Sequence, residues 1–502
     1  MICICAEERK SSAALSSRQL PQILEIFSPL KEGSVLRLSR HLTIFFFGIS
    51  LLVLGCQEGK PRVSSLQTAV SPSPCLLSVY LETSGICGQN TSFVLSSMEI
   101  LSDGLWLPLD LEKNEFKSSE VKDRQTFLGA SALPEGNYKA VRFRIENSSG
   151  PSQKTTEKSE IVVPIAREFS LARSDSSCLF VEWMLRDCPS GQQSTPKLHV
   201  RLQEQPLSSD LLYVLCGASR TLYLVRADNY FVISSYGLPG RCGEMHVDSS
   251  NHRLYILNTQ QRLIHVFDTG TSRFIDRISL NQLINPEHFA LDTENSIAFV
   301  TDSDSSTVLS IDLKTGQVNS QQRSLIRPQR IIGFSDSGLL YLAVASPQTQ
   351  SISILSATDL QKIREIRVGQ KMDGILYHQG FLYAAETNSN QVSVFDAIAG
   401  QYQGRISVGL QPRYLSADAG GRIFVSNSGG NTLSVITPGQ FVSARTLRVK
   451  EHPFVSAVSS QRQNLYVGYE DKGMVSILDV ASERPLAEVH FAGAPFFLDI
   501  LE

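Results

Sequence analysis

Few residues of this 502-residue chain have the spacing of a known catalytic or metal-binding motif. The sequence contains no Gly-x-Ser-x-Gly elbow, no His-Glu-x-x-His pair, no glycine-rich phosphate loop and no Cys-x-x-Cys pair. His246 and His288 fall on adjacent predicted strands, but no third metal ligand accompanies them. The sequence therefore predicts no metal site, no cofactor and no enzymatic activity.

A set of charged residues is the other candidate for chemistry, placed by counting back from a recurring aromatic triplet. These residues would begin successive innermost strands of a ring of sheets and could bind a polar ligand at a channel mouth. The alternative, which we favour, is that neighbouring strands neutralise each other through ion pairs and water. Recurring carboxylates such as Asp268 and Asp312 are predicted to form turns instead. The ring candidates are Glu287, Arg330, Asp373 and Arg413, with Gly243 and Phe454 at equivalent positions.

Seven copies of an apolar–aromatic–apolar triplet would position these residues. The aromatic residues are 42, 44, 42, 42, 41 and 42 residues apart, and such a regular period indicates a repeat architecture. Each period also contains further short apolar segments, and four antiparallel strands per period are typical of a propeller blade. The triplets are Leu212–Val214, Leu254–Ile256, Ala298–Val300, Leu340–Leu342, Leu382–Ala384, Ile423–Val425 and Leu465–Val467.

Several of these repeats match a known family. Segments 411–427, 382–396 and 465–479 resemble the YVTN repeat, which implies an all-β fold with a seven-bladed β-propeller. Met372 departs from the pattern, because other repeats have proline there. We expect the last strand, at Pro495–Ile500, to pair with the first repeat, which would close the ring and remove exposed sheet edges.

A smaller all-β region precedes the repeats at residues 76–207. Short apolar segments alternate there with turn residues, and residues 138–145 alternate apolar and basic side chains, as in a half-buried strand. The segment 133–138 resembles the Leu-Pro-x-Gly-x-Tyr corner of immunoglobulin-like and transthyretin-like (prealbumin-like) bacterial domains. We therefore expect a small β-sandwich of this type, with Trp106 and Trp183 in its core.

The N-terminal region has the features of an export signal. Residues 42–54 carry no charge and are shorter than the roughly 20 residues that a membrane-spanning helix needs. Arg37 and Arg40 precede this run, as in the basic region of a signal peptide. Residues 1–34 have no role in such a signal, which suggests a misassigned translation start. The residues Val53-Leu54-Gly55-Cys56 resemble the lipobox of bacterial lipoproteins, which implies acylation of Cys56.

The segment after this cysteine, residues 57–74, is polar and rich in proline and serine, which predicts a flexible tether. An aspartate directly after the lipidated cysteine would retain a lipoprotein in the inner membrane, and this chain has Gln57 at that position. We therefore expect an outer-membrane lipoprotein that faces the periplasm or the cell surface. The predicted organisation is leader and signal peptide at 1–55, lipidated cysteine and tether at 56–75, β-sandwich at 76–207 and propeller at 208–502.

The remaining six of the nine cysteines form three locally close pairs. An even number in an exported chain favours disulfide bonds, and free buried thiols are the alternative. The predicted pairs are Cys75 with Cys87, Cys178 with Cys188, and Cys216 with Cys242.

The function classes follow from this organisation. Lipoproteins that join an immunoglobulin-like domain to a YVTN propeller are known as surface antigens. The resemblance implies a monomeric, membrane-anchored binding or scaffold protein that recognises a protein, a glycan or a small ligand. One alternative is a lactonase-like or lyase-like hydrolase acting in the central channel. Another is periplasmic binding of single-stranded nucleic acid, which a net charge of −3 does not support.

Overall fold

The structure is a computed structural model that describes residues 74–502, except 86–90, 148–156, 186–195, 204–209, 438, 440 and 442–443. Strands dominate these residues, and the single helix assigned among them is the short α1 (Ser118–Val121). The predicted all-β fold class is therefore confirmed. The predicted signal peptide, Cys56 and most of the tether lie outside the described residues. Within the described part of the chain, no helix has the length and apolar character needed to cross a bilayer.

The first nine strands form two sheets over one shared core. One sheet has the order β5-β1-β8-β9, and the other has the order β3-β2-β6-β7 with β4 beside β2. Apolar side chains of both sheets meet in a single buried cluster. The strands are β1 (Cys75–Ser84), β2 (Ser92–Ser102), β3 (Leu105–Leu109), β4 (Glu115–Lys117), β5 (Thr126–Leu133), β6 (Gly136–Asn147), β7 (Glu157–Leu171), β8 (Ser176–Met184) and β9 (Lys197–Leu202).

The two tryptophans of this region differ in burial. Trp183 lies in the core, as predicted, with its ring edge-on to Phe93 at a centroid distance of 4.8 Å. The prediction for Trp106 was wrong, because β3 is an edge strand and this side chain is only half-buried. The guanidinium of Arg142 lies 4.3 Å from the Trp106 ring and covers it instead.

Strand β1 buries both of its faces. Leu77 and Val79 point into the core shared by the first two sheets, whereas Tyr80 belongs to a second buried cluster that includes Tyr223 of the repeat region. The Ser78 hydroxyl, on the same face as Tyr80, lies 2.8 Å from the Tyr223 hydroxyl. Period-two alternation therefore lets one strand serve two cores.

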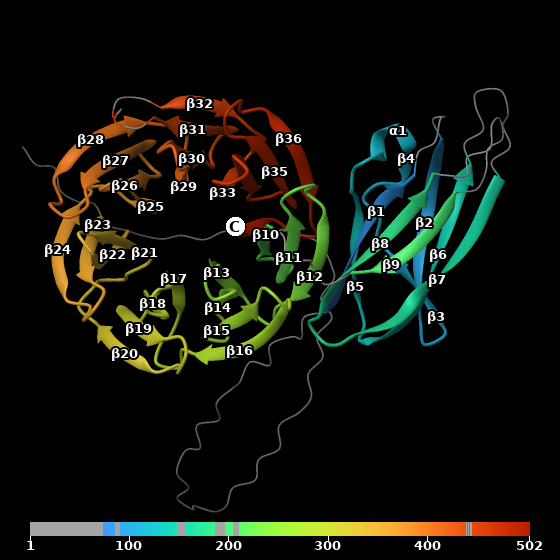
Figure 1. Ribbon diagram of the computed structural model, residues 1–502, viewed down its shortest axis with the longest axis horizontal. Helices are drawn as coiled ribbons and strands as arrows, with labels where there is room; N and C mark the ends of the chain where they lie inside the picture. The colour runs from blue at the N-terminus through green and yellow to red at the C-terminus, as the bar shows by residue number, and fades with distance from the viewer. Residues whose placement is uncertain are drawn as a thin grey trace, which may run out of the picture. The chain divides into compact units, whose positions relative to one another are not determined.

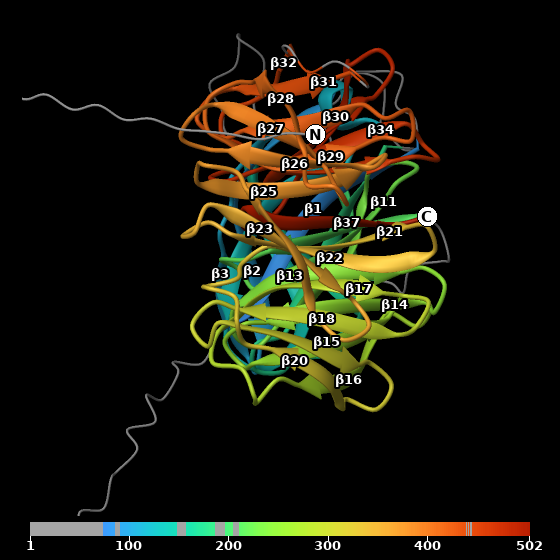
Figure 2. The same cartoon turned by 90° about the vertical axis from the view of Figure 1, so that its left-hand side faces the viewer.

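The repeats form seven four-stranded antiparallel sheets among the described residues. Figure 1 shows these sheets arranged around a common centre, which is a propeller-like arrangement of repeated sheets, and Figure 2 shows their strands from the side. Each predicted aromatic triplet lies in the second strand of its sheet. The innermost strands are β13 (Cys242–Asp248), β17 (Pro286–Asp292), β21 (Ile331–Asp336), β25 (Met372–His378), β29 (Pro412–Ala417), β33 (Pro453–Ser459) and β37 (Pro495–Leu501).

The other strands follow outward in chain order. The second strands are β10 (Leu211–Cys216), β14 (Arg253–Asn258), β18 (Ile297–Asp302), β22 (Leu339–Ser346), β26 (Phe381–Glu386), β30 (Ile423–Asn427) and β34 (Asn464–Tyr469). The third strands are β11 (Thr221–Arg226), β15 (Leu263–Asp268), β19 (Thr307–Asp312), β23 (Ser351–Ser356), β27 (Gln391–Asp396), β31 (Thr432–Ile436) and β35 (Met474–Asp479). The outer strands are β12 (Val232–Gly237), β16 (Arg273–Ser279), β20 (Val318–Gln322), β24 (Lys362–Arg367), β28 (Tyr402–Ser407), β32 (Arg445–Arg448) and β36 (Pro485–His490).

One sheet draws its strands from distant parts of the chain. Strand β37 pairs antiparallel with β10, so that Leu212 lies opposite Ile500 and Val214 lies opposite Leu498. The sheet order is β12-β11-β10-β37, and the other six sheets each use four consecutive strands. Met372, which stands in place of the recurring proline, begins β25 in the same way as the prolines begin their strands.

The predicted disulfide between Cys216 and Cys242 is not formed. Both residues are buried free thiols, and they belong to different apolar clusters. Cys75 and Cys178 are also free and buried, and their predicted partners, Cys87 and Cys188, lie outside the described residues. Burial raises the pKa of Cys242 to about 12, so this thiol stays protonated and unreactive in the folded protein.

We predict that iodoacetamide will label Cys216 and Cys242 only after unfolding. Both thiols are enclosed by apolar side chains, so native protein should give unlabelled peptides, whereas protein denatured without a reductant should give fully labelled ones. Peptide mass spectrometry measures both, with a reduced and denatured sample as the reference. Recovery of a Cys216–Cys242 cross-linked peptide would contradict the structure.

Candidate functional site

Bulged inner strands bring polar side chains together at the centre of the ring of sheets. The pairing register shifts just after the first residue of β17, between Pro286 and His288, and likewise in β29, between Pro412 and Tyr414. A bulge of this kind changes the direction of the side chain that follows it. Strand β13 has the same irregularity near Glu244, so that Glu244, His288 and Tyr414 are third residues of comparably bulged strands.

Glu244 is the central residue of this cluster, and its side chain is almost fully buried. Its Oε2 accepts a hydrogen bond of 2.9 Å from the backbone N–H of Phe289 and lies 3.3 Å from His288 Nδ1. Its Oε1 lies 3.4 Å from Nη1 of Arg330. Burial alone would raise the pKa of Glu244, but the imidazoles of His288 and His246 hold it well below the ordinary value. The carboxylate is therefore ionised and compensated by groups from three sheets.

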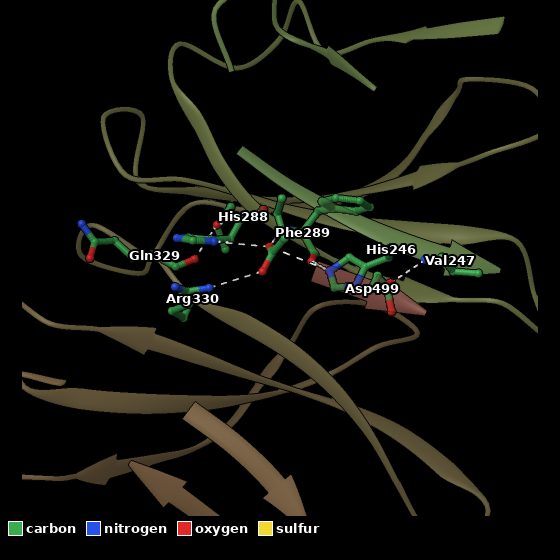
Figure 3. Close-up of polar contacts among 9 residues, drawn as sticks. His246, Val247, His288, Phe289, Gln329, Arg330 and Asp499 are labelled. Atoms are coloured by element: carbon green, nitrogen blue, oxygen red, sulfur yellow. Dashed lines mark hydrogen bonds and ion pairs between the residues drawn. The ribbon is translucent and has the colours of Figure 1, made fainter. Parts of the chain in front are cut away.

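His246 lies on the other side of Glu244, and Figure 3 shows it between Phe289 and Asp499. Its Nε2 donates a hydrogen bond of 2.9 Å to the backbone oxygen of Phe289 and is 3.9 Å from Oε2 of Glu244. Burial lowers the pKa of His246, but Glu244 and Asp499 outweigh this effect and raise it. Both histidines thus act as partners of Glu244.

A small cavity of about 180 Å³ opens where the inner strands begin, and we call it the Arg330 mouth. Arg330 donates from Nε to the backbone oxygen of Asp373 at 3.2 Å, and its guanidinium lies 5.7 Å from the ring of Tyr414. Arg413 donates from Nη1 to Glu470 at 3.0 Å, and its guanidinium lies 5.8 Å from the ring of Phe454. The lining residues are His288, Gln329, Arg330, Asp373, Arg413, Tyr414 and Phe454.

The Arg330 mouth contains three of the four residues of the predicted ring. Arg330, Asp373 and Arg413 line one cavity, and Nε of Arg413 lies 3.7 Å from Oδ2 of Asp373 without forming a hydrogen bond. Glu287 does not join them, because its Oε1 accepts a hydrogen bond of 2.6 Å from Ser303. Two guanidiniums therefore retain donor groups near the cavity.

Glu244 is not among the residues predicted from the sequence. Counting back from the aromatic triplet places Gly243 in the ring, one residue before Glu244. The available signal was that Glu244 and His288 occupy the same third position of their strands. No group of three or more His, Cys, Asp or Glu side chains suited to a metal ion occurs among the residues that the structure describes.

A second cavity of about 430 Å³ opens where the inner strands end, and we call it the Asp499 mouth. His246, Asp499 and Phe497 line it, together with the hydroxyl groups of Ser416 and Ser456. Tyr414 is the one residue that lines both mouths. The two cavities are therefore separate openings of one central channel, divided at the level of Tyr414.

A larger cavity of about 820 Å³ lies away from the channel, along β5 and β36. Its charged lining residues, among them Glu112, Asp123, Arg124 and Glu488, are exposed to solvent. In the channel, by contrast, charged groups of different sheets are buried against each other. This cavity therefore offers hydrated charges, whereas the channel offers desolvated ones.

The comparisons with known proteins establish no family. No family model matches the chain, and no curated protein sequence matches it. A functionally unknown protein from Desulfotomaculum acetoxidans DSM 771 has a similar structure, with a TM-score of 0.51, 10% identity, and 58% of this chain and 99% of that chain covered. This similarity concerns the fold alone.

Two further solved structures are more distant. The dihydro-heme d1 dehydrogenase NirN in complex with DHE has a TM-score of 0.44 and 10% identity, with 56% of this chain and 63% of that chain covered. Less than two thirds of that enzyme is therefore matched. Hydrazine synthase of Kuenenia stuttgartiensis has a TM-score of 0.43 and 16% identity, with 50% and 87% covered.

We predict that Glu244→Gln destabilises the fold by about 3 kcal/mol at neutral pH, because it leaves Arg330 and the two histidines without their buried counter-charge. The folded-state pKa of Glu244 is lowered, so its contribution is complete above the unfolded pKa of about 4.3 and is lost as the pH falls through the folded value. Urea unfolding at several pH values measures this. Glu287→Gln, outside the cluster, is the control, and an equal loss of stability in both variants would argue against a central role for Glu244.

Proposed function

We propose that the seven sheets are the blades of a YVTN-type β-propeller closed by β37, preceded by an immunoglobulin-like or prealbumin-like β-sandwich. The steady period of the aromatic triplets and the pairing of β37 with β10 support this proposal. Two observations support the β-sandwich at residues 76–207. Its two sheets share one core, and the hydroxyl of Tyr138 donates a hydrogen bond to the backbone oxygen of Pro134 within the predicted corner.

The same proposal places the protein in the bacterial envelope as a lipoprotein. Its support is the uncharged run at 42–54, the two arginines before it and the lipobox-like residues that end at Cys56. Acyl chains on this cysteine would hold the folded part at a membrane surface, at roughly 0.8 kcal/mol for each buried CH₂ group. Gln57 favours the outer membrane.

The propeller would act by binding, and the Arg330 mouth favours a small ligand that carries a carboxylate. The observation that carries this conclusion is the pair of guanidiniums, Arg330 and Arg413, that faces a cavity of about 180 Å³. Arginine donates to carboxylates in a planar two-bond geometry. Arg330 is held by Glu244 and by the backbone oxygen of Asp373, so its position is set before any ligand arrives.

Catalysis in this channel has less support. A general base needs a pKa near the working pH and a free lone pair, whereas Glu244 is ionised and shared among a backbone N–H, Arg330 and His288. The Nε2 of His246 is occupied by the Phe289 carbonyl. Binding of a partner therefore explains the geometry better than a lactonase-like or lyase-like reaction.

We predict that the protein binds succinate but not its neutral diamide, succinamide, and that Arg413→Gln weakens succinate binding about tenfold or more. The reason is the loss of a charge-assisted hydrogen bond to the carboxylate, which contributes about 1.5–3 kcal/mol. Isothermal titration calorimetry at low salt measures the affinity. Arg445→Gln is the matched control. Arg445 lies on the outer strand β32, is exposed to solvent and forms an ion pair with Glu483. Equal binding of succinate and succinamide, or no binding of either, would refute the anion site.

We also predict that cells expressing the protein incorporate radioactive palmitate into it and that Cys56→Ser abolishes the label, because the thiol of Cys56 would be the acceptor. Cys242→Ser, which alters a buried thiol, should leave the label intact. Protease treatment of intact cells then distinguishes surface display from a periplasmic orientation. Label retained in Cys56→Ser would exclude this cysteine as the lipid site.

A further inference from the structure

The Asp499 mouth contains a half-buried carboxylate that forms no ion pair with a lysine or an arginine of the described chain. Asp499 lies on β37, where its Oδ2 accepts a hydrogen bond of 2.8 Å from the backbone N–H of Val247, a contact drawn in Figure 3. Its Oδ1 accepts a hydrogen bond of 2.9 Å from the N–H of Ile500. Within the described part of the chain, no lysine, arginine or histidine nitrogen lies within ion-pair distance of this carboxylate. Two neutral donors thus hold a group that carries a full charge when ionised.

A carboxylate held by two neutral donors is stabilised further by a cation, because neutral donors replace only part of the hydration that burial removes. Burial raises the pKa of Asp499, and His246 lowers it without cancelling this effect. His246 compensates Asp499 only in part, because its Nε2 donates to Phe289 and lies 3.9 Å from Oε2 of Glu244. A cationic ligand in the cavity would complete this compensation.

The other lining groups define the chemistry of that ligand. The rings of Tyr414 and Phe497 stand nearly perpendicular to each other, with centroids 6.1 Å apart, and both line the cavity. The hydroxyls of Ser416 and Ser456 lie 2.8 Å from each other on neighbouring strands. Aromatic faces attract cations, and an ammonium group has three N–H donors that need three acceptors. One carboxylate and two hydroxyls match this requirement.

We propose that the Asp499 mouth binds the primary ammonium group of a small ligand, with Asp499 as the counter-charge, Ser416 and Ser456 as further acceptors, and Tyr414 and Phe497 as the apolar wall. This site does not depend on the proposed anion site, because the two mouths share only Tyr414. A metal ion fits less well, since Asp499 already accepts two backbone N–H groups and Glu502, the other carboxylate that lines the cavity, is exposed to solvent.

The test uses the purified full chain and butylammonium at pH 7.5, with butanol as the neutral probe of the same length. We expect calorimetry to detect butylammonium and not butanol, and Asp499→Asn to weaken butylammonium binding roughly tenfold or more. Asp499→Asn should keep or raise the melting temperature, because it removes a half-buried charge and leaves an acceptor for Val247. Loss of binding would then not reflect unfolding.

Asp396→Asn is the matched control. Oδ1 of Asp396 also accepts hydrogen bonds from two backbone N–H groups, but this residue ends β27 and lies outside both cavities. Ser456→Ala gives a second variant, which should weaken butylammonium binding several-fold without disturbing the fold. Arg413→Gln should leave it unchanged, which separates this site from the anion site. Equal binding of butanol, unchanged affinity in Asp499→Asn, or displacement of butylammonium by Mg²⁺ would each overturn the proposal.

Discussion

A single buried charge, the carboxylate of Glu244, constrains the centre of this protein. An ionised carboxylate in a water-poor interior must be surrounded by donors and cations, and here Glu244 and these partners come from three different sheets. Phe289 and His288 belong to β17, Arg330 precedes β21, and Glu244 itself belongs to β13. Each sheet packs on its neighbours by apolar contacts that have no direction of their own. The charge cluster adds direction, because it tolerates only small changes in how these three strands approach each other.

The polarity of the two mouths follows from where residues stand along the inner strands. Positions at the strand starts carry Arg330 and Arg413, so this end of the channel presents donors. Three residues further along, the strands carry His246, Ser416 and Asp499, so the other end presents acceptors together with one imidazole. Tyr414 lies between, and Glu244 compensates charge on both sides of it. The two ends therefore differ in charge, although Asp373 also lines the arginine-rich mouth and His246 also lines the acidic one.

Part of this architecture could be predicted from the sequence, because it depends on periodic apolar patterns. The aromatic triplets marked the second strand of every sheet, and the recurring prolines marked most of the inner strand starts. The bulges could not be predicted, since a bulge is an irregularity of pairing between two strands and leaves no period in either. A one-residue offset therefore concealed Glu244, whereas the hydrogen bond from Ser303 keeps Glu287 away from the cavity. The pairing of Cys216 with Cys242 failed for a related reason: nearness in sequence says nothing about which face of a sheet each thiol occupies.

The contrast between Glu244 and Asp499 indicates which of the two is available to a ligand. Glu244 is buried and Asp499 is half-buried, and both accept backbone hydrogen bonds. Glu244 has cationic partners within the protein, and its lowered pKa shows that the folded chain already stabilises its charge. Asp499 forms no ion pair among the described residues, His246 compensates it only in part, and its pKa is raised. A fold selected only for stability would replace Asp499 with a neutral residue, so a partly compensated acid on the strand that pairs with β10 is better explained by a cation that arrives from outside.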